Sequence, residues 1–259
     1  MQPTPYPDVN TVLHILLSNV QAVLGDEFVG MYVYGSLASG DFNPERSDID
    51  FLVVTKSKLP EAMLPNLAAM HDRIASIGLK WATKLEGSYI PKSALRRYDP
   101  ARSWHPSFWN GKFAVDQHRS DWVIHLHLIR ERGIVVAGPD PRILIDPVLP
   151  DDMRRAVLAS LRDWWAPMLD DPFRLRSDEY QVYAILTMCR MFYTLEHGEV
   201  ISKPTAAHWV MESLYPRWSA LIEQALTWRP SLAFDHFEET LDFIRYALER
   251  GNACHSERL

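Results

Sequence analysis

The sequence has little cysteine, no excess of basic residues and no long apolar run. Two cysteines among 259 residues make neither a disulfide framework nor a zinc site, and they suit a reducing compartment. No apolar stretch approaches the roughly 20 residues of a membrane helix. Residues 1–8 lack the basic start and the apolar core of a secretion signal. We therefore expect a cytoplasmic protein without a membrane partner.

The charge balance argues against another class of partner. Lys and Arg number 27 against 33 Asp and Glu, which gives a net charge of −6. Proteins that bind extended nucleic acid are usually basic, so we expect no nucleic-acid partner. Residues 151–259 hold 17 Asp and Glu against 12 Lys and Arg. This half of the chain attracts a cation more than an anion.

The most informative segment is residues 31–55, MYVYGSLASGDFNPERSDIDFLVVT. A Gly35-Ser36 turn follows one apolar run, and after eleven intervening residues Asp48 and Asp50 stand at the head of a second apolar run. Side chains two apart in a strand point to the same face, so the two carboxylates aim together. Paired carboxylates beside a phosphate-sized turn are what magnesium-dependent phosphoryl chemistry needs. The alternative is that Asp48 and Asp50 are exposed residues at the start of a strand and that Gly35 only makes a turn. This alternative does not explain why both acids fall on one face beside the turn.

Two serines of this segment are candidates for phosphate binding. Ser36 and the backbone N–H groups after Gly35 can hold phosphate oxygens, as nests of N–H groups do. Ser47 directly precedes the candidate metal ligands Asp48 and Asp50 and can also contact phosphate. Its alternative role is to cap the turn, and the sequence leaves both roles open.

A third carboxylate is needed if a hydroxyl group is the acceptor, because a base must take the hydroxyl proton. Glu86 is the candidate, within a strand predicted over residues 80–90. A Glu directly before a Gly in a strand suggests that another group approaches closely. The alternative is a solvent-facing Glu86 paired with Lys84.

Hydrophobic periodicity predicts the organisation of the chain. Before residue 150 we expect helices over 9–25 and 60–77, strands over 28–34, 49–55 and 80–90, a polar loop or short helix over 38–47, an irregular segment over 94–120, a strand or helix over 121–132, and a short apolar run over 134–137. After residue 150 we expect helices over 151–166, 178–197, 204–213, 216–227 and 234–250. The predicted fold is therefore α+β: a catalytic domain with a mixed sheet and helices over 1–150, a helical domain over 151–259, and a ligand cleft between them.

The ordered pair of a Gly-Ser turn and Asp-x-Asp resembles the signature of the nucleotidyltransferase superfamily with the polymerase-β-like fold. Three further segments resemble the aminoglycoside (3'')(9) adenylyltransferases, which confer streptomycin and spectinomycin resistance: Lys84-Leu-Glu86, RERGIVVAGP over 130–139, and LTMCRMFYTLEHGEVISKPTAAHW over 186–209. The similarity covers most of residues 25–230. It implies a polymerase-β-like nucleotidyltransferase domain followed by an all-α helical bundle, with Mg²⁺ and ATP as cofactors. Ser36 matches the serine of the family's phosphate turn.

The resemblance assigns roles residue by residue. Asp48 and Asp50 match the metal acids, and Glu86 matches the carboxylate taken as the catalytic base, which can also ligate metal. Arg190 and Lys203 match cations of the helical domain that contact the nucleotide phosphates across the cleft. Basic side chains from a second domain suit a triphosphate, which carries several negative charges.

The acceptor is less well defined. Drug-modifying members carry a drug-binding acid shortly before the Arg190 helix; the nearest acid here is Asp178, two residues too far away, and Tyr180 falls at the family position. Trp104 or Trp109 can supply the aromatic ring that stacks on the drug. We expect transfer of AMP from ATP to a hydroxyl of a small molecule, first of all an aminoglycoside or aminocyclitol of the streptomycin or spectinomycin type. The alternative acceptor is another metabolite or a protein. We expect a monomer or a weak homodimer.

Overall fold

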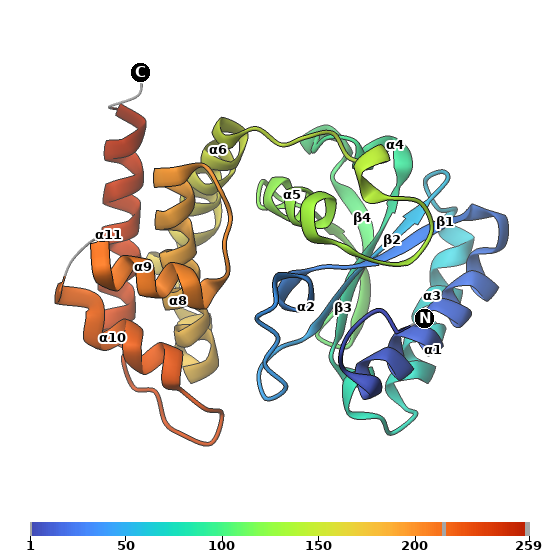
Figure 1. The fold of residues 1–259 in the computed structure, drawn as a ribbon, viewed down its shortest axis with the longest axis horizontal. Helices are drawn as coiled ribbons and strands as arrows, with labels where there is room; N and C mark the ends of the chain where they lie inside the picture. Colours follow the sequence, from blue (N-terminus) through green and yellow to red (C-terminus); the bar gives the residue numbers. More distant parts are fainter. Residues whose placement is uncertain (1, 214–215, 257–259) are drawn as a thin grey trace. The chain divides into compact units, whose positions relative to one another are not determined.

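The computed structural model describes residues 2–213 and 216–256 of the chain. The chain divides into two compact units between Pro147 and Val148. The first unit holds a mixed sheet with helices, and the second is helical, as the sequence predicted (Figure 1). Within the described ranges, no helix is both long enough and apolar enough to span a membrane.

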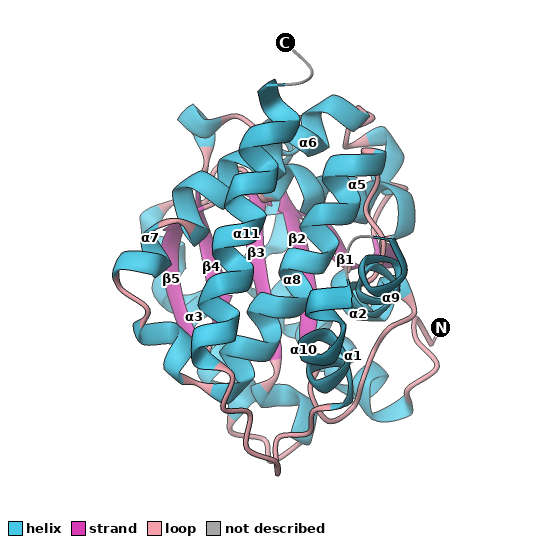
Figure 2. Ribbon diagram, turned by 90° about the vertical axis from the view of Figure 1, so that its left-hand side faces the viewer, coloured by secondary structure: helices cyan, strands magenta, loops and turns pink. Residues whose placement is uncertain are grey.

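The sheet of the first unit has the strand order β5-β4-β3-β2-β1-β6. Its strands are β1 (Phe28–Val33), β2 (Ile49–Thr55), β3 (Leu85–Pro91), β4 (Trp104–Trp109), β5 (Lys112–Gln117) and β6 (Ile134–Ala137). Figure 2 shows β5 to β1 side by side in this order. Only β2 and β3 pair in parallel; the other described neighbours are antiparallel. A parallel pair needs a crossover connection, and α3 (Leu64–Ala75) supplies it.

One face of the sheet is covered by two amphipathic helices. The helices α1 (Pro7–Leu24) and α3 bury their apolar stripes against alternate residues of β1 and β2. Met31 and Val33 of β1 and Phe51 and Val53 of β2 belong to this core and are fully buried. The period-two pattern of these strands is what fixes which residues face the helices.

The opposite face of the sheet is covered by α5 (Trp122–Arg132), which settles the choice between strand and helix for this segment in favour of the helix. Its residues Trp122, Leu126 and Ile129 pack with Leu52 and Val54 of β2. These two strand residues follow Asp50 in the same alternation. The acids at the start of β2 therefore lie on the α5 face and not on the face covered by α1 and α3.

The second unit is built around one buried helix. It contains α6 (Pro150–Ser160), a π-helical turn over Leu161–Trp165, α7 (Pro167–Asp170), α8 (Asp178–His197), α9 (Lys203–Ser213), α10 (Pro216–Thr227) and α11 (Phe237–Ser256). The helix α8 contacts α6, α9, α10 and α11, and twelve of its twenty residues are buried. This explains why its sequence is apolar on most sides. The free thiol of Cys189 lies in this core.

A buried histidine stands in the core between the sheet and α3. His71 Nε2 lies 2.7 Å from the Tyr89 hydroxyl, and its ring stacks on Phe108 with a centroid distance of 4.1 Å. Burial lowers the pKa of His71 to about 3. The folded protein therefore holds this imidazole neutral at a pH where an unfolded chain would protonate it.

We expect His71 to destabilise the fold in acid. Between the unfolded pKa of 6.5 and the folded pKa of about 3, the unfolded state binds one more proton, so stability falls as the pH drops, by at most about 1.4 kcal/mol per pH unit. Urea unfolding of the full chain between pH 7 and pH 4 measures this slope. His71→Phe should reduce the slope of the unfolding free energy against pH by up to about 1.4 kcal/mol per pH unit, the contribution of one proton. A slope that His71→Phe leaves unchanged would contradict the assignment.

Candidate active site

The parallel pairing of β2 and β3 gathers the predicted acids at one end of the sheet. Asp50 lies opposite Glu86 in the register of this pair. Asp48 directly precedes β2, and the N–H of Ile49 donates to the carbonyl of Lys84 at 2.7 Å, which carries the pairing to the strand starts. Paired residues of adjacent strands point to the same face. Asp48, Asp50 and Glu86 therefore share one face.

The predicted glycine turn packs directly against one of these acids. Gly35 begins α2 (Gly35–Ser39) with a φ of +64°, in the left-handed region that favours glycine. A Cβ atom at Gly35 would lie 1.8 Å from Asp50 Oδ2. The backbone N–H of Tyr34 donates to the carbonyl of Asp50 at 3.0 Å. The turn and Asp50 thus form one unit, and no side chain larger than hydrogen fits at Gly35.

The glycine after Glu86 has a different reason. A Cβ atom at Gly87 would lie 2.2 Å from the carbonyl oxygen of Phe51 and 2.5 Å from its ring. The close approach expected from the Glu-Gly pair is therefore made by the buried core. Gly87 keeps β3 tight against β2 and gives no evidence for a ligand beside Glu86.

The electrostatics of the cluster are dominated by crowded negative charge. The pKa of Glu86 is raised to about 8, first by burial and then by the carboxylates of Asp48 and Asp50. The backbone N–H of Asn110, which donates to Glu86, and the ammonium group of Lys84 act in the opposite direction. Lys84 Nζ forms an ion pair with Asp48 Oδ1 at 3.3 Å. Lys84 thus offsets part of the negative charge of the acids.

Two of these acids suit a divalent cation. Within the described part of the chain, no three His, Cys, Asp or Glu side chains are gathered as a metal site. Magnesium is commonly bound by one or two carboxylates, with phosphate and water oxygens completing its shell. Asp48 and Asp50, at the start of β2 with crowded negative charge around them, fit that description. Glu86 lies beside them in the register.

The two candidate serines differ in their surroundings. Ser36 lies in the first turn of α2, half-buried, and its carbonyl accepts from the N–H of Asp41 at 3.0 Å. Ser47 Oγ accepts from the N–H of Asn43 at 2.9 Å. The capping role considered for Ser47 is thus present, although its hydroxyl hydrogen can still be donated elsewhere.

The prediction of an irregular segment over 94–120 is wrong. The segment contains α4 (Lys92–Leu95) at its start and then the hairpin of β4 and β5. Asn110 and Gly111 form its two-residue turn with φ of 49° and 69°, and Trp109 pairs with Lys112 across it. An Asn-Gly pair is the strongest short-range hairpin signal. That signal was present in the sequence and would have located the turn, and the structure places its Asn110 beside Glu86.

The two candidate tryptophans lie on opposite faces of β4. Gly87 pairs with Phe108, so one further step of the antiparallel register places Trp109 opposite Glu86. Trp109 is 47% exposed on the face of the acids. Trp104 is 59% exposed, and strand alternation puts it on the other face with Phe108. Only Trp109 is therefore brought to the acidic cluster.

In the helical unit, Lys203 packs beside an aromatic residue of α8. Lys203 Nζ lies 3.9 Å from the centre of the Tyr183 ring, a cation–π contact. Tyr183 and Arg190 are seven residues apart on α8 and so share one helix face. The structure thus brings Lys203 to the face of α8 that carries Arg190, within one unit.

Asp178, the candidate for binding the acceptor, has a structural partner. Its Oδ2 accepts from the backbone N–H of Phe234 at 3.0 Å. Gln181 Oε1, one turn later on α8, accepts from the N–H of His236 in the same way. The two side chains hold the segment before α11 against α8.

Comparisons with known proteins agree with this arrangement. Residues 18–105 match the nucleotidyltransferase domain family, and residues 143–250 match the C-terminal domain family of aminoglycoside adenylyltransferases. A spectinomycin 9-adenylyltransferase of Staphylococcus aureus is 30% identical over 81% of this chain and 80% of its own length. The chain belongs to the aminoglycoside adenylyltransferase family. It is thereby a nucleotidyltransferase, and the predicted α+β fold class with a helical C-terminal unit is confirmed.

More distant relatives of the family give the same result. The aminoglycoside (3'')(9) adenylyltransferase of Shigella flexneri is 26% identical over 84% of each chain. The crystal structure of spectinomycin adenyltransferase from Enterococcus faecialis, solved with ATP and spectinomycin, superposes with a TM-score of 0.75. It is 21% identical and covers 93% of this chain and 98% of its own. This likeness extends the common fold over both units.

We expect Gly35→Ala to disable nucleotidyl transfer. The added Cβ must displace the Asp50 carboxylate, and a misplacement of about 1 Å in an active site can cost roughly 100-fold in rate. The control is Gly40→Ala, because Gly40 also has a positive φ, +79°, but has nothing within 4 Å of its Cβ position. The rate of transfer and the melting temperature are measured for both variants. Equal activity in the two would contradict the close contact with Asp50.

Proposed function

We propose that the enzyme transfers AMP from ATP to a hydroxyl group of an aminoglycoside or aminocyclitol antibiotic of the streptomycin or spectinomycin type. The support for adenylyl transfer is the Asp50–Glu86 pair, in register and beside the Gly35 turn, in a chain of this family. The acidic second half of the sequence suits a polycationic acceptor. We propose that the enzyme works in the cytoplasm, as a monomer or a weak homodimer.

In the proposed reaction, Glu86 takes the proton of the acceptor hydroxyl. The acceptor oxygen then attacks the α-phosphorus, the bond to the bridging oxygen breaks, and pyrophosphate leaves. The raised pKa of Glu86 suits a general base, since a base is most effective when its pKa lies near the working pH. The N–H of Asn110 holds the carboxylate in place, and Trp109 stands beside it to stack on the acceptor.

The metal assignment rests on the donor set. We propose that Asp48 and Asp50 hold Mg²⁺, with Glu86 as a further ligand where it is not acting as the base. When bound, the ion supplies positive charge that offsets the charge developing on the phosphate oxygens. Ser36 and the N–H groups of the Gly35 turn bind phosphate oxygens. The Ser47 hydroxyl accepts from the N–H of Asn43 and can still donate its hydrogen to a phosphate oxygen.

Arg190 and Lys203 are the proposed phosphate-binding cations of the helical unit. Both lie on or against one face of α8, and a planar guanidinium and a point-charge ammonium bind phosphate oxygens in complementary ways. The contact of Lys203 with the Tyr183 ring helps to orient the ammonium group.

Pyrophosphate release from ATP and Mg²⁺ tests the acceptor. The panel contains streptomycin, spectinomycin, other aminoglycosides, and hydroxylated antibiotics without amines. We expect release with streptomycin or spectinomycin and a product heavier by one AMP in the mass spectrum. No release with any aminocyclitol, from an enzyme that binds ATP, would refute this acceptor class.

Two substitutions separate the roles of the acids. Asp50→Ala should abolish transfer while the chain stays folded, since the metal loses a ligand. Glu86→Gln should bind ATP normally and fail to turn over, since the amide cannot accept the proton. Asp146→Asn is the control, because Asp146 pairs with Arg96 and Arg97 in the same unit. Unchanged turnover in Glu86→Gln would remove this residue from the mechanism.

For the helical unit, we expect Arg190→Gln and Lys203→Gln each to raise the KM for ATP about tenfold, because a lost hydrogen bond to a charged group is worth roughly 1.5–3 kcal/mol. The control is Arg245→Gln, which removes an exposed cation paired with Asp242 on α11. Steady-state kinetics at saturating acceptor give the values. An unchanged KM for ATP in both variants would refute their contact with the nucleotide.

One observation favours a second acceptor class for the same reaction. The carboxylate of Asp178 accepts a hydrogen bond from the chain itself, and the aromatic Tyr180 stands two residues later. An acceptor with fewer amines, or another hydroxylated metabolite, needs no acid there. Release with such a compound and not with streptomycin would select this alternative.

A further inference from the structure

Three buried polar side chains form a closed cluster behind Glu86. Ser88 Oγ lies 3.1 Å from Ser107 Oγ, and His118 Nε2 lies 3.0 Å from the first and 3.1 Å from the second. None of the three side chains is more than 7% exposed. Ser88 is two residues after Glu86 on β3, so it points to the same face.

This cluster joins three segments of the sheet. Ser88 belongs to β3, Ser107 belongs to β4, and His118 directly follows β5. The described ladder between β3 and β4 has only two residue pairs, Gly87 with Phe108 and Ser88 with Ser107. The N–H of His118 donates to the carbonyl of Ser103 at 2.7 Å and closes the base of the hairpin. The His118 imidazole thus links the hairpin to β3, the strand that carries Glu86.

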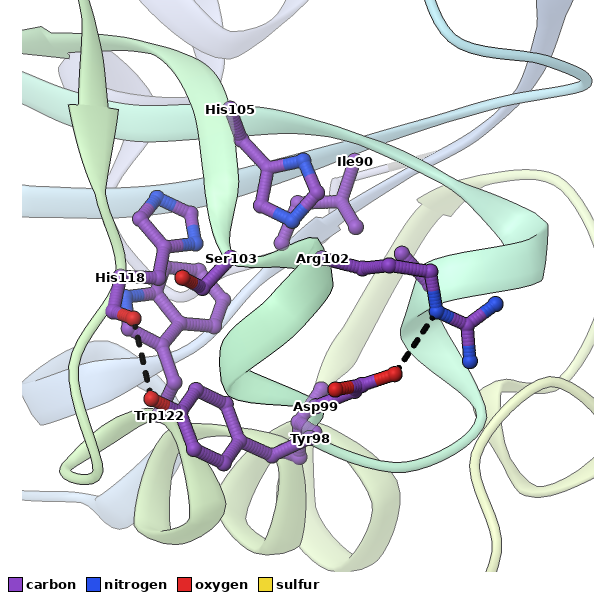
Figure 3. A pocket seen from close by; sticks show the side chains of 10 residues that line it. Ile90, Tyr98, Asp99, Arg102, Ser103, His105, His118 and Trp122 are labelled. Atoms are coloured by element: carbon purple, nitrogen blue, oxygen red, sulfur yellow. Dashed lines mark hydrogen bonds and ion pairs between the residues drawn. The ribbon is translucent and has the colours of Figure 1, made fainter.

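The cluster is not a second catalytic site. Burial lowers the pKa of His118 to about 2, and the ring stacks on Trp122 with a centroid distance of 3.9 Å. Figure 3 shows His118 beside Trp122 at the wall of a cavity with His105 and Tyr98. The cavity measures about 10 Å³, which is room for about one water molecule and for no substrate. The cluster therefore acts on the structure around it.

The nearest functional group that it can act on is Glu86. The hairpin turn carries Asn110, whose N–H donates to the Glu86 carboxyl. The same turn carries Trp109, opposite Glu86 in the register. A shift of the hairpin along β3 would move both groups relative to the carboxyl. The packing of Phe108 on His71 holds the other face of the hairpin; on the face of Glu86, the side-chain cluster adds to this short ladder.

We propose that His118 is a positioning residue for Glu86: it binds Ser88 and Ser107 and thereby holds the turn residue Asn110 against the carboxyl. The inference rests on the proposed role of Glu86 as the base. Loss of the imidazole nitrogen loosens the hairpin, and the carboxyl is then misaligned with the acceptor. Asp48, Asp50 and the Gly35 turn lie outside the hairpin, at the start of β2 and in α2, so we expect nucleotide binding to change less than turnover.

The first test uses two replacements of the same imidazole in the full-length enzyme. His118→Phe keeps a ring against Trp122 and removes both nitrogens. It should lower kcat roughly ten- to hundredfold, because misalignment of this size costs that much, while the KM for ATP changes by less than about twofold. His118→Gln restores an amide group that can bond to the serines and should recover most of kcat. Ser107→Ala should give an intermediate loss.

Ile90→Ala is the matched control for lost stability. Ile90 follows Ser88 by two residues on the same face of β3 and lines the same cavity, so its truncation weakens the same packing without removing a hydrogen bond. It should lower the melting temperature at least as much as His118→Phe does, with kcat close to wild type. A loss of kcat as large as that of His118→Phe would show that packing alone is responsible and would overturn the proposal. So would wild-type kcat in His118→Phe.

A second measurement does not depend on turnover. Hydrogen exchange of the Asn110 amide reports its bond to Glu86, because a donated N–H exchanges slowly. We expect faster exchange in His118→Phe, slow exchange in His118→Gln, and slow exchange in Ile90→Ala. If the wild-type enzyme shows no transfer but exchange follows this order, the function is refuted and the positioning stands. If exchange is unchanged in His118→Phe, the positioning is refuted while the function stands.

Discussion

The parallel pairing of β2 and β3 holds three carboxylates together against their mutual repulsion. The rest of the first unit is arranged around this constraint. Asp48, Asp50 and Glu86 are held together by backbone pairing that their charges oppose. The fold stabilises this arrangement with the Lys84 ion pair and the Asn110 N–H. The crowded negative charge at the starts of β2 and β3 raises the pKa of Glu86. Under the proposed function, a divalent cation bound by Asp48 and Asp50 would reduce this repulsion.

The second unit has a different electrostatic character. Its central helix α8 is buried on most sides, and the face of α8 that carries Tyr183 and Arg190 also receives Lys203. Under the proposed function, Arg190 and Lys203 are the cations that would bind the phosphates. Asp178 accepts a hydrogen bond from the backbone of the same unit. The helical unit is acidic as a whole, with 17 Asp and Glu against 12 Lys and Arg over residues 151–259, and these two cations stand out against that background.

Sequence reasoning reached the elements whose signal is local. Residues 49–55 and 178–197 were predicted with the observed bounds, because one is a β-branched apolar run and the other an apolar helix that ends at Gly198. The register of β2 against β3 depends on tertiary packing between distant segments. The sequence alone therefore could not show that Asp50 pairs with Glu86. The β4–β5 hairpin was not predicted, although the pair Asn110-Gly111 is a strong hairpin signal. Without the hairpin, the sequence could not tell which of Trp104 and Trp109 lies on the face of the acids.

The close packing of Gly87 against Phe51 limits how the enzyme can evolve. Any side chain at Gly87 would separate β3 from β2, and with them Glu86 from Asp50. The acid-bearing strands are thus nearly closed to change. The outer strand of the hairpin, β5, is an edge of the sheet with mostly exposed side chains, so these side chains can be exchanged at little cost to folding. New acceptors should therefore be acquired by substitutions in the hairpin while the two strands keep their sequence.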